Sequence, residues 1–425
     1  MANRARPEIL APAGDVEKLQ FAIAYGADAV YVGGKQFSLR ANTKNFDLTE
    51  LKTAIDYAHK HNVRVYVAVN IFAHNQDFLG LKEYLQALKN IGADAVIVAD
   101  LGVLAVAREI EGLEIHVSTQ ANITNYQSAQ MYKNLGASRV ILARELSFSE
   151  VSEINQKVSD DTFQTEVFAH GAMCVSYSGR CLLSSYMTGR DSNKGDCAQP
   201  CRWKYHLVEE ERPGEYLPVY EDERGTYIMN SKDLCLIKHI PQLVQSGVSS
   251  LKIEGRMKSA YYVAVATSIY RQALDDYLAD ENLYYSKLDW YMDELQKTSH
   301  RNFFSGFFAD GHGQNRHSGL DPESPKVSQG VQGQVYEKNT YSSTYNFLAV
   351  VTDYNPATGC AIVEQRNKFK LGDSVEFMKG GFAQQITYMA NEKGQEVQSA
   401  PHAQECIYIK VDKPVKKFDI MRIKI

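Results

Sequence analysis

The sequence predicts an α/β fold: a (β/α)8 TIM-like barrel with a cysteine-rich insertion after strand 7, followed by a small C-terminal all-β barrel domain. The first observation is an internal repeat in which a helix-ending glycine and a polar pair precede a short apolar strand. A glycine after a helix adopts the left-handed conformation, and a continuous apolar run suits a parallel strand buried on both faces. The repeat occurs in YGADAVYVG from Tyr25, IGADAVIVAD from Ile91, LGASRVILAR from Leu135 and SGVSSLKIEG from Ser246.

The second observation is the number of such strands. Eight parallel strands separated by helices predict a closed barrel. A doubly wound open sheet is the alternative, since periodicity does not show closure, but no glycine-rich dinucleotide loop follows the first strand. The eight strand centres are Leu10, Val30, Val67, Ile97, Val117, Ile141, Phe168 and Ile253.

Helices are expected between these strands. Asp15 is expected to cap the first helix, which ends at Gly26. The segment NSKDL from Asn230 is expected to cap a later helix, on which Cys235 would lie. The other helices are expected at 49–60, 78–91, 101–111, 128–135, 147–157, 236–244, 261–278 and 283–296.

The third observation is a change of pattern near residue 333, where short alternating strands replace the strand–helix alternation. The chain therefore divides into a barrel domain, 1–305, a linker, 306–332, and a β domain, 333–425. The cysteine-rich insertion and a hairpin of 205–209 with 225–229 occupy 171–235. Strands of the β domain, with Cys360 and Cys406 as buried side chains, are expected at 346–353, 360–366, 374–378, 386–389, 407–411 and 419–423.

Composition indicates a globular, cytoplasmic protein. Of the 425 residues, 44% are hydrophobic and 23% are charged, and no apolar run approaches the roughly 18 residues of a membrane span. The N-terminus lacks the apolar region of a signal peptide. The net charge of −5 means that any nucleic acid must be bound by a local basic patch.

Four of the seven cysteines, Cys174, Cys181, Cys197 and Cys201, follow the seventh strand with spacing C-x6-C-x15-C-x3-C. In a reducing compartment such a group indicates metal or redox chemistry rather than disulfides. Three interpretations remain open: packed thiols, structural zinc, and an iron–sulfur cluster, which takes four thiolates. Cys235 is an alternative ligand. Positive charge that would stabilise thiolates comes from Arg180, Arg190, Lys194 and Arg202.

Candidate site residues lie at the carboxyl ends of the strands, where barrel active sites are found. Arg40, on the loop after the second strand, is a candidate for binding a carboxylate. His170 is a candidate for orienting substrate, with an interior strand-end histidine as the alternative. Arg144 with Glu145, and Glu254 with Arg256, are charge pairs that are either catalytic or structural. Polar candidates for a substrate edge are Asn70, Gln120 and Asn122.

The chain resembles the collagenase-like "unassigned" peptidase family, U32. The motifs that carry the resemblance are EVFAHGAMC, SYSGRCLLS, GRDSNKGDCAQPCRWKY, YIMNSKDL, SLKIEGRMKS, EILAPAG, FSLRA and STQAN. Within that family it is most similar to the bacterial tRNA 5-hydroxyuridine hydroxylation proteins. The resemblance implies an enzyme that hydroxylates the wobble uridine of tRNA, with prephenate as co-substrate and an iron–sulfur (4Fe-4S) cluster.

The resemblance also implies ligands for this cluster. The matching cysteines are Cys174, Cys181, Cys197 and Cys201, and in ubiquinone-hydroxylating relatives a cysteine aligned with Cys235 replaces the one at Cys201. Two other functions remain as alternatives: a peptidase, and a metal-binding RNA-binding module without catalysis. A Cys174/His170 pair would be the peptidase nucleophile and base, but the sequence has neither HExxH nor GxSxG.

The predicted macromolecular partner is the anticodon stem-loop of tRNA, and a partner subunit or an oligomer remains open. Arg180, Arg202 and Arg256 are candidate substrate-binding cations. Tyr177, Tyr186 and Trp203 are candidates for stacking an extruded base. A second candidate basic surface for RNA is formed by Lys410, Lys413, Lys416, Lys417, Arg422 and Lys424. The alternative is that these side chains protect an edge strand from pairing with another chain.

Overall fold

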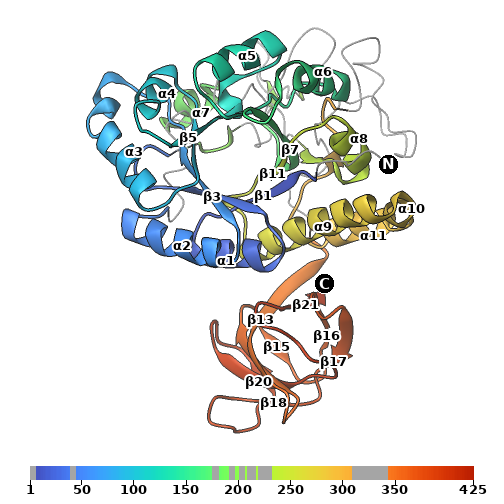
Figure 1. The fold of residues 1–425 in the computed structure, drawn as a ribbon. Coiled ribbons are helices and arrows are strands. Elements are labelled where there is room, and N and C mark those ends of the chain that lie inside the picture. The colour runs from blue at the N-terminus through green and yellow to red at the C-terminus, as the bar shows by residue number, and fades with distance from the viewer. Residues whose placement is uncertain are drawn as a thin grey trace. The chain divides into compact units, whose positions relative to one another are not determined.

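The computed structural model describes residues 6–38, 45–174, 181–190, 197–200, 232–308 and 343–425, and the backbone of 206–207 and 217–218. The chain forms two compact units, Met1–Met292 with His300–Tyr341 and Asp293–Ser299 with Ser342–Ile425 (Figure 1). Most of the predicted linker, 306–332, lies outside the described residues. No described helix has the length and apolar character needed to cross a membrane.

The first unit is a closed barrel of eight parallel strands (Figure 1). Each strand pairs with the next, and the last pairs with both the first and the seventh, which closes the sheet. All eight predicted strand centres lie in these strands, so the barrel is confirmed and the open sheet is excluded. The strands are β1 (Glu8–Pro12), β2 (Ala29–Gly33), β3 (Arg64–Val69), β4 (Ala95–Val98), β5 (Glu114–Val117), β6 (Arg139–Ile141), β7 (Gln164–Ala172) and β11 (Ser250–Ile253).

Helices surround the barrel, and side-chain caps define where several of them begin (Figure 1). Asp15 caps the first helix, as predicted, by accepting from the N–H of Lys18. Asp47 with Glu50 forms a capping box at the second. The helices are α1 (Val16–Ala24), α2 (Leu48–Lys60), α3 (Leu81–Asn90), α4 (Leu101–Ala107), α5 (Tyr126–Asn134), α6 (Phe148–Val158), α7 (Leu183–Thr188), α8 (Ile240–Gln245) and α9 (Ala260–Ala279).

The structure corrects three predictions near the insertion. Cys235 lies on a strand, β10 (Asp233–Cys235), and not on a helix, because β7 extends beyond the barrel and offers a free edge for antiparallel pairing. The predicted helix at 283–296 is two helices, α10 (Glu281–Ser286) and α11 (Leu288–Gln296). Strand β8 (His206–Leu207) pairs with β9 (Leu217–Pro218), and the predicted partner 225–229 lies outside the described residues.

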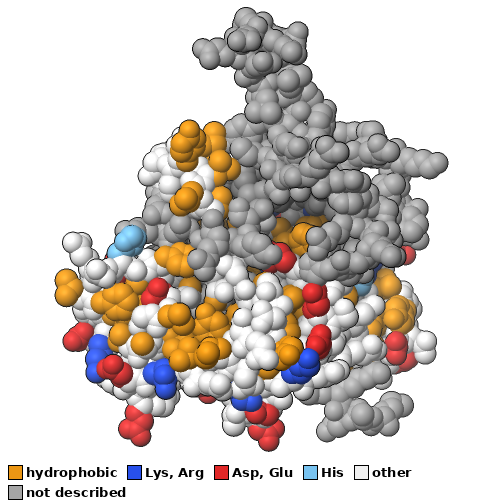
Figure 2. Space-filling model, turned by 90° about the horizontal axis from the view of Figure 1, so that it is seen from above, with side chains coloured by type: hydrophobic (Ala, Val, Ile, Leu, Met, Phe, Trp, Pro, Cys, Tyr) orange, Lys and Arg blue, Asp and Glu red, His pale blue; other side chains and the backbone are white. Residues whose placement is uncertain are grey.

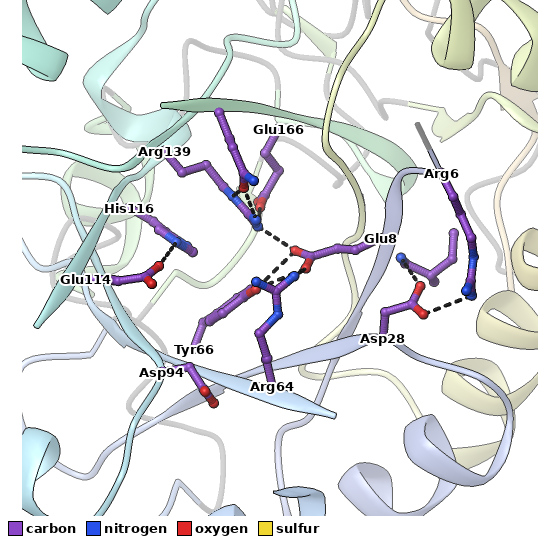
Figure 3. A network of polar contacts seen from close by, with 12 residues as sticks. Arg6, Glu8, Asp28, Arg64, Tyr66, Asp94, Glu114, His116, Arg139 and Glu166 are labelled. Atoms are coloured by element: carbon purple, nitrogen blue, oxygen red, sulfur yellow. Dashed lines mark hydrogen bonds and ion pairs between the residues drawn. The ribbon is translucent and has the colours of Figure 1, made fainter. Parts of the chain in front are cut away.

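The barrel interior holds a network of buried charges at the amino-terminal ends of the strands (Figure 3). Arg139 forms ion pairs with Glu8 and, at 3.2 Å, with Glu166. Lys252 Nζ lies 3.0 Å from Glu166, and the Tyr66 hydroxyl donates to Glu8 at 3.0 Å. Since β1, β3 and β6 are not neighbours in the sheet, these contacts cross the interior of the barrel.

The second unit is an antiparallel β domain around one apolar core. Its seven-stranded sheet runs in the order β17-β16-β21-β13-β14-β20-β18. Cys360 and Cys406 lie on strands as predicted but are only half-buried. The predicted strand at 386–389 is wrong, because Ile386 lies between two strands. The strands are β13 (Tyr345–Asn355), β14 (Cys360–Gln365), β16 (Ser374–Phe377), β17 (Phe382–Gln385), β18 (Met389–Ala390), β20 (Cys406–Lys410) and β21 (Ile420–Lys424).

Arg422, predicted as part of a basic surface, is instead an interior residue of this unit. Its guanidinium is 3% exposed and lies 2.8 Å from a carboxylate oxygen of Glu294 and 3.0 Å from Glu376. Lys297 lies 2.7 Å from the same Glu294. The prediction was wrong for this arginine because Glu294 and Glu376 cover the face of β21 opposite the apolar core and neutralise its charge.

Candidate functional site at the barrel mouth

An amide cluster lies at the carboxyl ends of β3 and β5. Asn70 Nδ2 donates to Gln120 Oε1 at 2.6 Å, and Gln120 Nε2 donates to the Asn70 carbonyl at 3.2 Å. Asn122 Nδ2 donates to the Gln120 carbonyl at 3.1 Å. The Asn122 Oδ1 atom is shielded from water and has no hydrogen-bond donor among the described residues. The cluster therefore fixes Gln120 and leaves one buried acceptor, Asn122 Oδ1, without a described donor.

A second polar group lies where β2 and β11 end. The Tyr31 hydroxyl donates to Glu254 Oε2 at 3.1 Å. Arg256 is 3% exposed, and its Nη1 donates to Ser38 Oγ at 3.1 Å. A Cβ atom on Gly33 would lie 2.1 Å from Arg256 Nη1, so the guanidinium lies directly against the end of β2. The predicted pair Glu254 and Arg256 is therefore held by two residues of the β2 end.

The predicted pair Arg144 and Glu145 lies at the end of β6. Arg144 Nη1 donates to the Ala172 carbonyl at 3.1 Å, and its guanidinium lies 5.4 Å from the centre of the Phe168 ring. Burial raises the pKa of the Glu145 carboxyl above its usual value, although Arg144 opposes this shift. Arg144 thus fixes the end of β7, from which the cysteine segment begins.

His170 does not point into the mouth. The register of β7 against β11 shifts between Lys252 and Ile253, so that Ala169 is an extra residue and the alternation of side chains reverses. The His170 ring is 1% exposed and contacts Tyr262 at 5.8 Å, Tyr270 at 5.4 Å and Phe303 at 5.4 Å between ring centroids. The structure places His170 in an aromatic cage with no access to solvent.

Three cysteines of the insertion lie among the described residues, all as free thiols. Cys174 follows β7 directly and is half-buried, Cys181 is half-buried before α7, and Cys197 is exposed. Across the described part of the chain, no three His, Cys, Asp or Glu side chains are grouped to hold a metal ion. Cys201 lies outside the described residues. The described residues therefore do not assemble a cluster site, and the four-thiolate ligand set remains an expectation from the sequence.

Cys235, the alternative fourth ligand, is buried on β10 opposite His170. Its sulfur lies 3.9 Å from the Tyr270 hydroxyl. Burial raises the pKa of the Cys235 thiol to about 11. Among the other predicted residues, Arg40, Arg180, Arg202, Tyr177 and Trp203 lie outside the described residues, whereas Tyr186 on α7 is 89% exposed.

Comparison with known proteins assigns the family. Residues 14–318 match peptidase family U32, and residues 343–422 match the peptidase family U32 C-terminal domain. The chain belongs to peptidase family U32. Each unit of this U32 protein therefore corresponds to a domain known from that family.

Its relatives carry names of two kinds. The chain is 38% identical to tRNA hydroxylation protein P1 of Bacillus subtilis, over 98% of this chain and 94% of the relative. It is 37% identical to the 23S rRNA 5-hydroxycytidine C2501 synthase of Escherichia coli, over 64% of this chain and 39% of the relative. A protein of Porphyromonas gingivalis named collagenase is 32% identical over 71% of this chain and 73% of its own length.

Sequence reasoning missed Tyr31, Ser38 and Ser118 at the mouth of the U32 barrel. Tyr31 lies within the apolar run of the second strand, and its hydroxyl reaches Glu254 only because β2 and β11 both flank β1. Ser118 Oγ donates to Gln120 Oε1 at 3.1 Å. For Ser118 the local signal was a hydroxyl residue directly after the fifth strand, whereas Tyr31 lies within its strand and carried no such signal.

The aromatic cage of His170 makes stability depend on pH. Burial lowers the pKa of His170 to about 3, against a usual value of 6.5. Below pH 6.5 the unfolded chain binds a proton that the folded chain does not, so the free energy of unfolding falls as the pH decreases from 6.5 toward 3. We expect His170→Phe, which fits the aromatic cage, to remove about 2 kcal/mol of this loss between pH 7 and pH 5.

Urea unfolding of both proteins at these two pH values measures the effect. His116, which is also buried with a lowered pKa, is present in both proteins and cancels in the comparison. Parallel pH profiles for the two proteins would contradict the assignment of a neutral, buried His170.

Proposed function

We propose that this U32 protein is an RNA-modifying enzyme that hydroxylates a nucleoside of RNA, and that its substrate is the wobble uridine in the anticodon stem-loop of tRNA. The product would be 5-hydroxyuridine, with prephenate as co-substrate. The observation that carries the proposal is the similarity to tRNA hydroxylation protein P1, which extends over both domains and nearly the full length of each chain. The relative acting on 23S rRNA favours the same reaction class.

Polar side chains at the barrel mouth match the groups that a uracil base and prephenate present. A uracil edge presents both carbonyl acceptors and an N–H donor. The amide cluster of Asn70, Gln120 and Asn122 has groups of both kinds, and the Asn122 Oδ1 acceptor has no described donor. Prephenate carries two carboxylates, for which Arg256 at the mouth, and Arg40 from the sequence, are the matching cations.

Four thiolates from Cys174, Cys181, Cys197 and Cys201 would bind the iron–sulfur cluster, with Cys235 as the alternative fourth ligand and zinc as the alternative metal. When bound, the cluster would supply one-electron chemistry or bind substrate. Arg144 would hold the end of β7, and with it the position of Cys174, through its bond to the Ala172 carbonyl.

Peptidase activity is the second candidate, because the family and one relative carry protease names. The geometry disfavours the Cys174/His170 pair as its catalytic centre. The described partners of the His170 ring are Tyr262, Tyr270 and Phe303, on the side of β7 that faces α9 and β12 (Phe303–Phe304). A base buried in this way cannot accept a proton from a nucleophile at the mouth.

The test is mass spectrometry of nucleosides from a bacterial strain that lacks its own U32 hydroxylation proteins. With the full chain supplied on a plasmid, we expect 5-hydroxyuridine in tRNA, and none in a strain that cannot make prephenate. Hydroxycytidine in ribosomal RNA alone would transfer the proposal to a ribosomal substrate. An unmodified RNA pool together with degradation of gelatin by the purified protein would replace the proposal with the peptidase function.

A further inference from the structure

One end of the β domain brings two segments of the chain together. The turn between β16 and β17, residues 378–382, lies beside the segment 412–419 that precedes β21. Asp419 joins them, because its buried carboxylate accepts from the backbone N–H groups of Lys379, at 2.7 Å, and Gly380, at 2.9 Å. The N–H of Met378 donates to the Ile420 carbonyl at 2.9 Å. The two segments therefore form one continuous surface.

This surface is rich in lysines that lack ion-pair partners. Lys413, Lys416 and Lys417 are exposed, and none forms an ion pair with a carboxylate of the described residues. Within 412–419 the sequence has three lysines and two acidic residues, Asp412 and the buried Asp419. With Lys379 on the neighbouring turn, the surface carries an excess of positive charge.

Three exposed lysines on the outside of the barrel differ from these, because each has a carboxylate partner. Lys52, Lys82 and Lys157 each lie 2.5 to 2.6 Å from a carboxylate, that of Asp56, Glu109 or Glu153. On the barrel face shown in Figure 2, the visible basic side chains lie close to acidic ones, and hydrophobic side chains occupy much of the rest. The charges of these three lysines are therefore neutralised by a neighbouring carboxylate, unlike those of Lys413, Lys416 and Lys417.

Two phenylalanine rings lie among these lysines. Phe382 and Phe418 are half-buried, with Lys413 Nζ 5.7 Å from the Phe382 ring centre and Lys417 Nζ 5.3 Å from the Phe418 ring centre. Phe377 stacks on Phe382 at 5.0 Å. Phe418 has φ +69°, a left-handed conformation that is uncommon and strained for a bulky side chain.

We infer that this lysine–phenylalanine patch, formed by Lys379, Lys413, Lys416, Lys417, Phe382 and Phe418, binds a single-stranded segment of RNA. Lysines provide phosphate contacts, and the accessible parts of aromatic rings provide surfaces on which unpaired bases stack. An acidic protein segment would match the positive charge of the patch. It would not, however, supply aromatic groups that stack on the two phenylalanine rings. The inference rests on the proposed function for the class of substrate, and it adds that the β domain supplies an RNA contact of its own.

Fluorescence anisotropy of the full chain with a labelled RNA hairpin that has a seven-nucleotide loop tests the patch. For Lys413→Gln/Lys416→Gln/Lys417→Gln we expect a Kd at least about tenfold higher, and a salt dependence of log Kd reduced by about 2 in slope. The matched control, Lys52→Gln/Lys82→Gln/Lys157→Gln, has the same net charge and is expected to bind within about twofold of the wild type. Circular dichroism melting verifies that both variants are folded.

A second variant separates stacking from charge. Phe382→Leu retains an apolar contact to Phe377 but removes the ring. We expect its Kd to rise about 5- to 100-fold while the salt slope stays unchanged, since stacking involves no phosphate contact.

The results of these binding measurements either support RNA binding by the patch or overturn it. An unchanged Kd and salt slope in the lysine variant, or an equal loss in the matched control, would overturn the inference, as would a wild-type chain that does not bind the hairpin. Loss of binding to labelled polyglutamate with intact RNA binding would assign the patch to an acidic protein instead. If the patch binds RNA as expected but the strain makes no hydroxylated nucleoside, the inference stands and the proposed function fails.

Discussion

Cells that carry the Cys174→Ala variant are expected to contain no detectable 5-hydroxyuridine in their tRNA, and the purified variant is expected to lose at least about a hundredfold in iron affinity. Loss of an outer contact around a metal already costs about 10- to 100-fold, and a direct thiolate ligand contributes more. Cys174 follows β7 directly, so its position is fixed by the barrel more firmly than those of the later cysteines.

The measurement is iron and sulfide analysis after anaerobic purification, alongside nucleoside mass spectrometry. Cys360→Ala is the matched control, because Cys360 is a half-buried cysteine on β14 of the other domain. Comparing Cys201→Ala with Cys235→Ala identifies the fourth ligand. Full iron content and full modification in the Cys174 variant would refute the cluster, and one zinc per chain in the wild type would assign a zinc site.

The largest loss of stability is expected from Arg139→Leu. Arg139 is 2% exposed and pairs with both Glu8 and Glu166 inside the barrel. Burial alone would raise the pKa of the Glu166 carboxyl, but Lys252 and Arg139 keep it below its usual value. Removal of the guanidinium leaves Arg64 as the remaining described cation for Glu8 and Lys252 as that for Glu166, so the two buried carboxylates are compensated less well, at a cost of up to about 3–5 kcal/mol in the free energy of unfolding.

Urea unfolding at neutral pH measures this cost. Lys157→Leu is the matched control, since its ion pair with Glu153 is exposed on α6 and is expected to change stability by no more than about 0.5 kcal/mol. Arg139→Leu combined with Glu166→Gln is expected to recover part of the loss, because the amide removes one buried charge. A single variant as stable as the control would show that solvent or other groups neutralise the two carboxylates.

The two ends of the barrel have different roles. Glu8, Arg139 and Glu166 lie at the amino-terminal ends of the strands, where barrel residues contribute to stability (Figure 3). The amide cluster and Arg256 lie at the opposite ends. We therefore expect the Arg139 variant, when folded, to keep the RNA affinity of the wild type.

The sequence by itself determined the eight strands, their order and the presence of most helices between them, although several helix starts differ from the predicted ones. Its signals are local: an apolar run, a glycine after a helix, or an aspartate such as Asp15 before one. The same local pattern put Cys174 at the end of the seventh strand, and therefore at the barrel mouth. These features depend only on residues that lie close together in the sequence.

The tertiary structure alone decided features that depend on residues far apart in the chain. The pairing of β11 with β7 closed the barrel, and the extra residue in that pairing turned His170 away from the mouth. Pairing with β7 also made a strand of the segment containing Cys235. In the β domain, internal carboxylates surround Arg422, whereas Lys413 remains unpaired at the surface. Periodicity does not carry this information, because register and charge pairing are set by which strands meet.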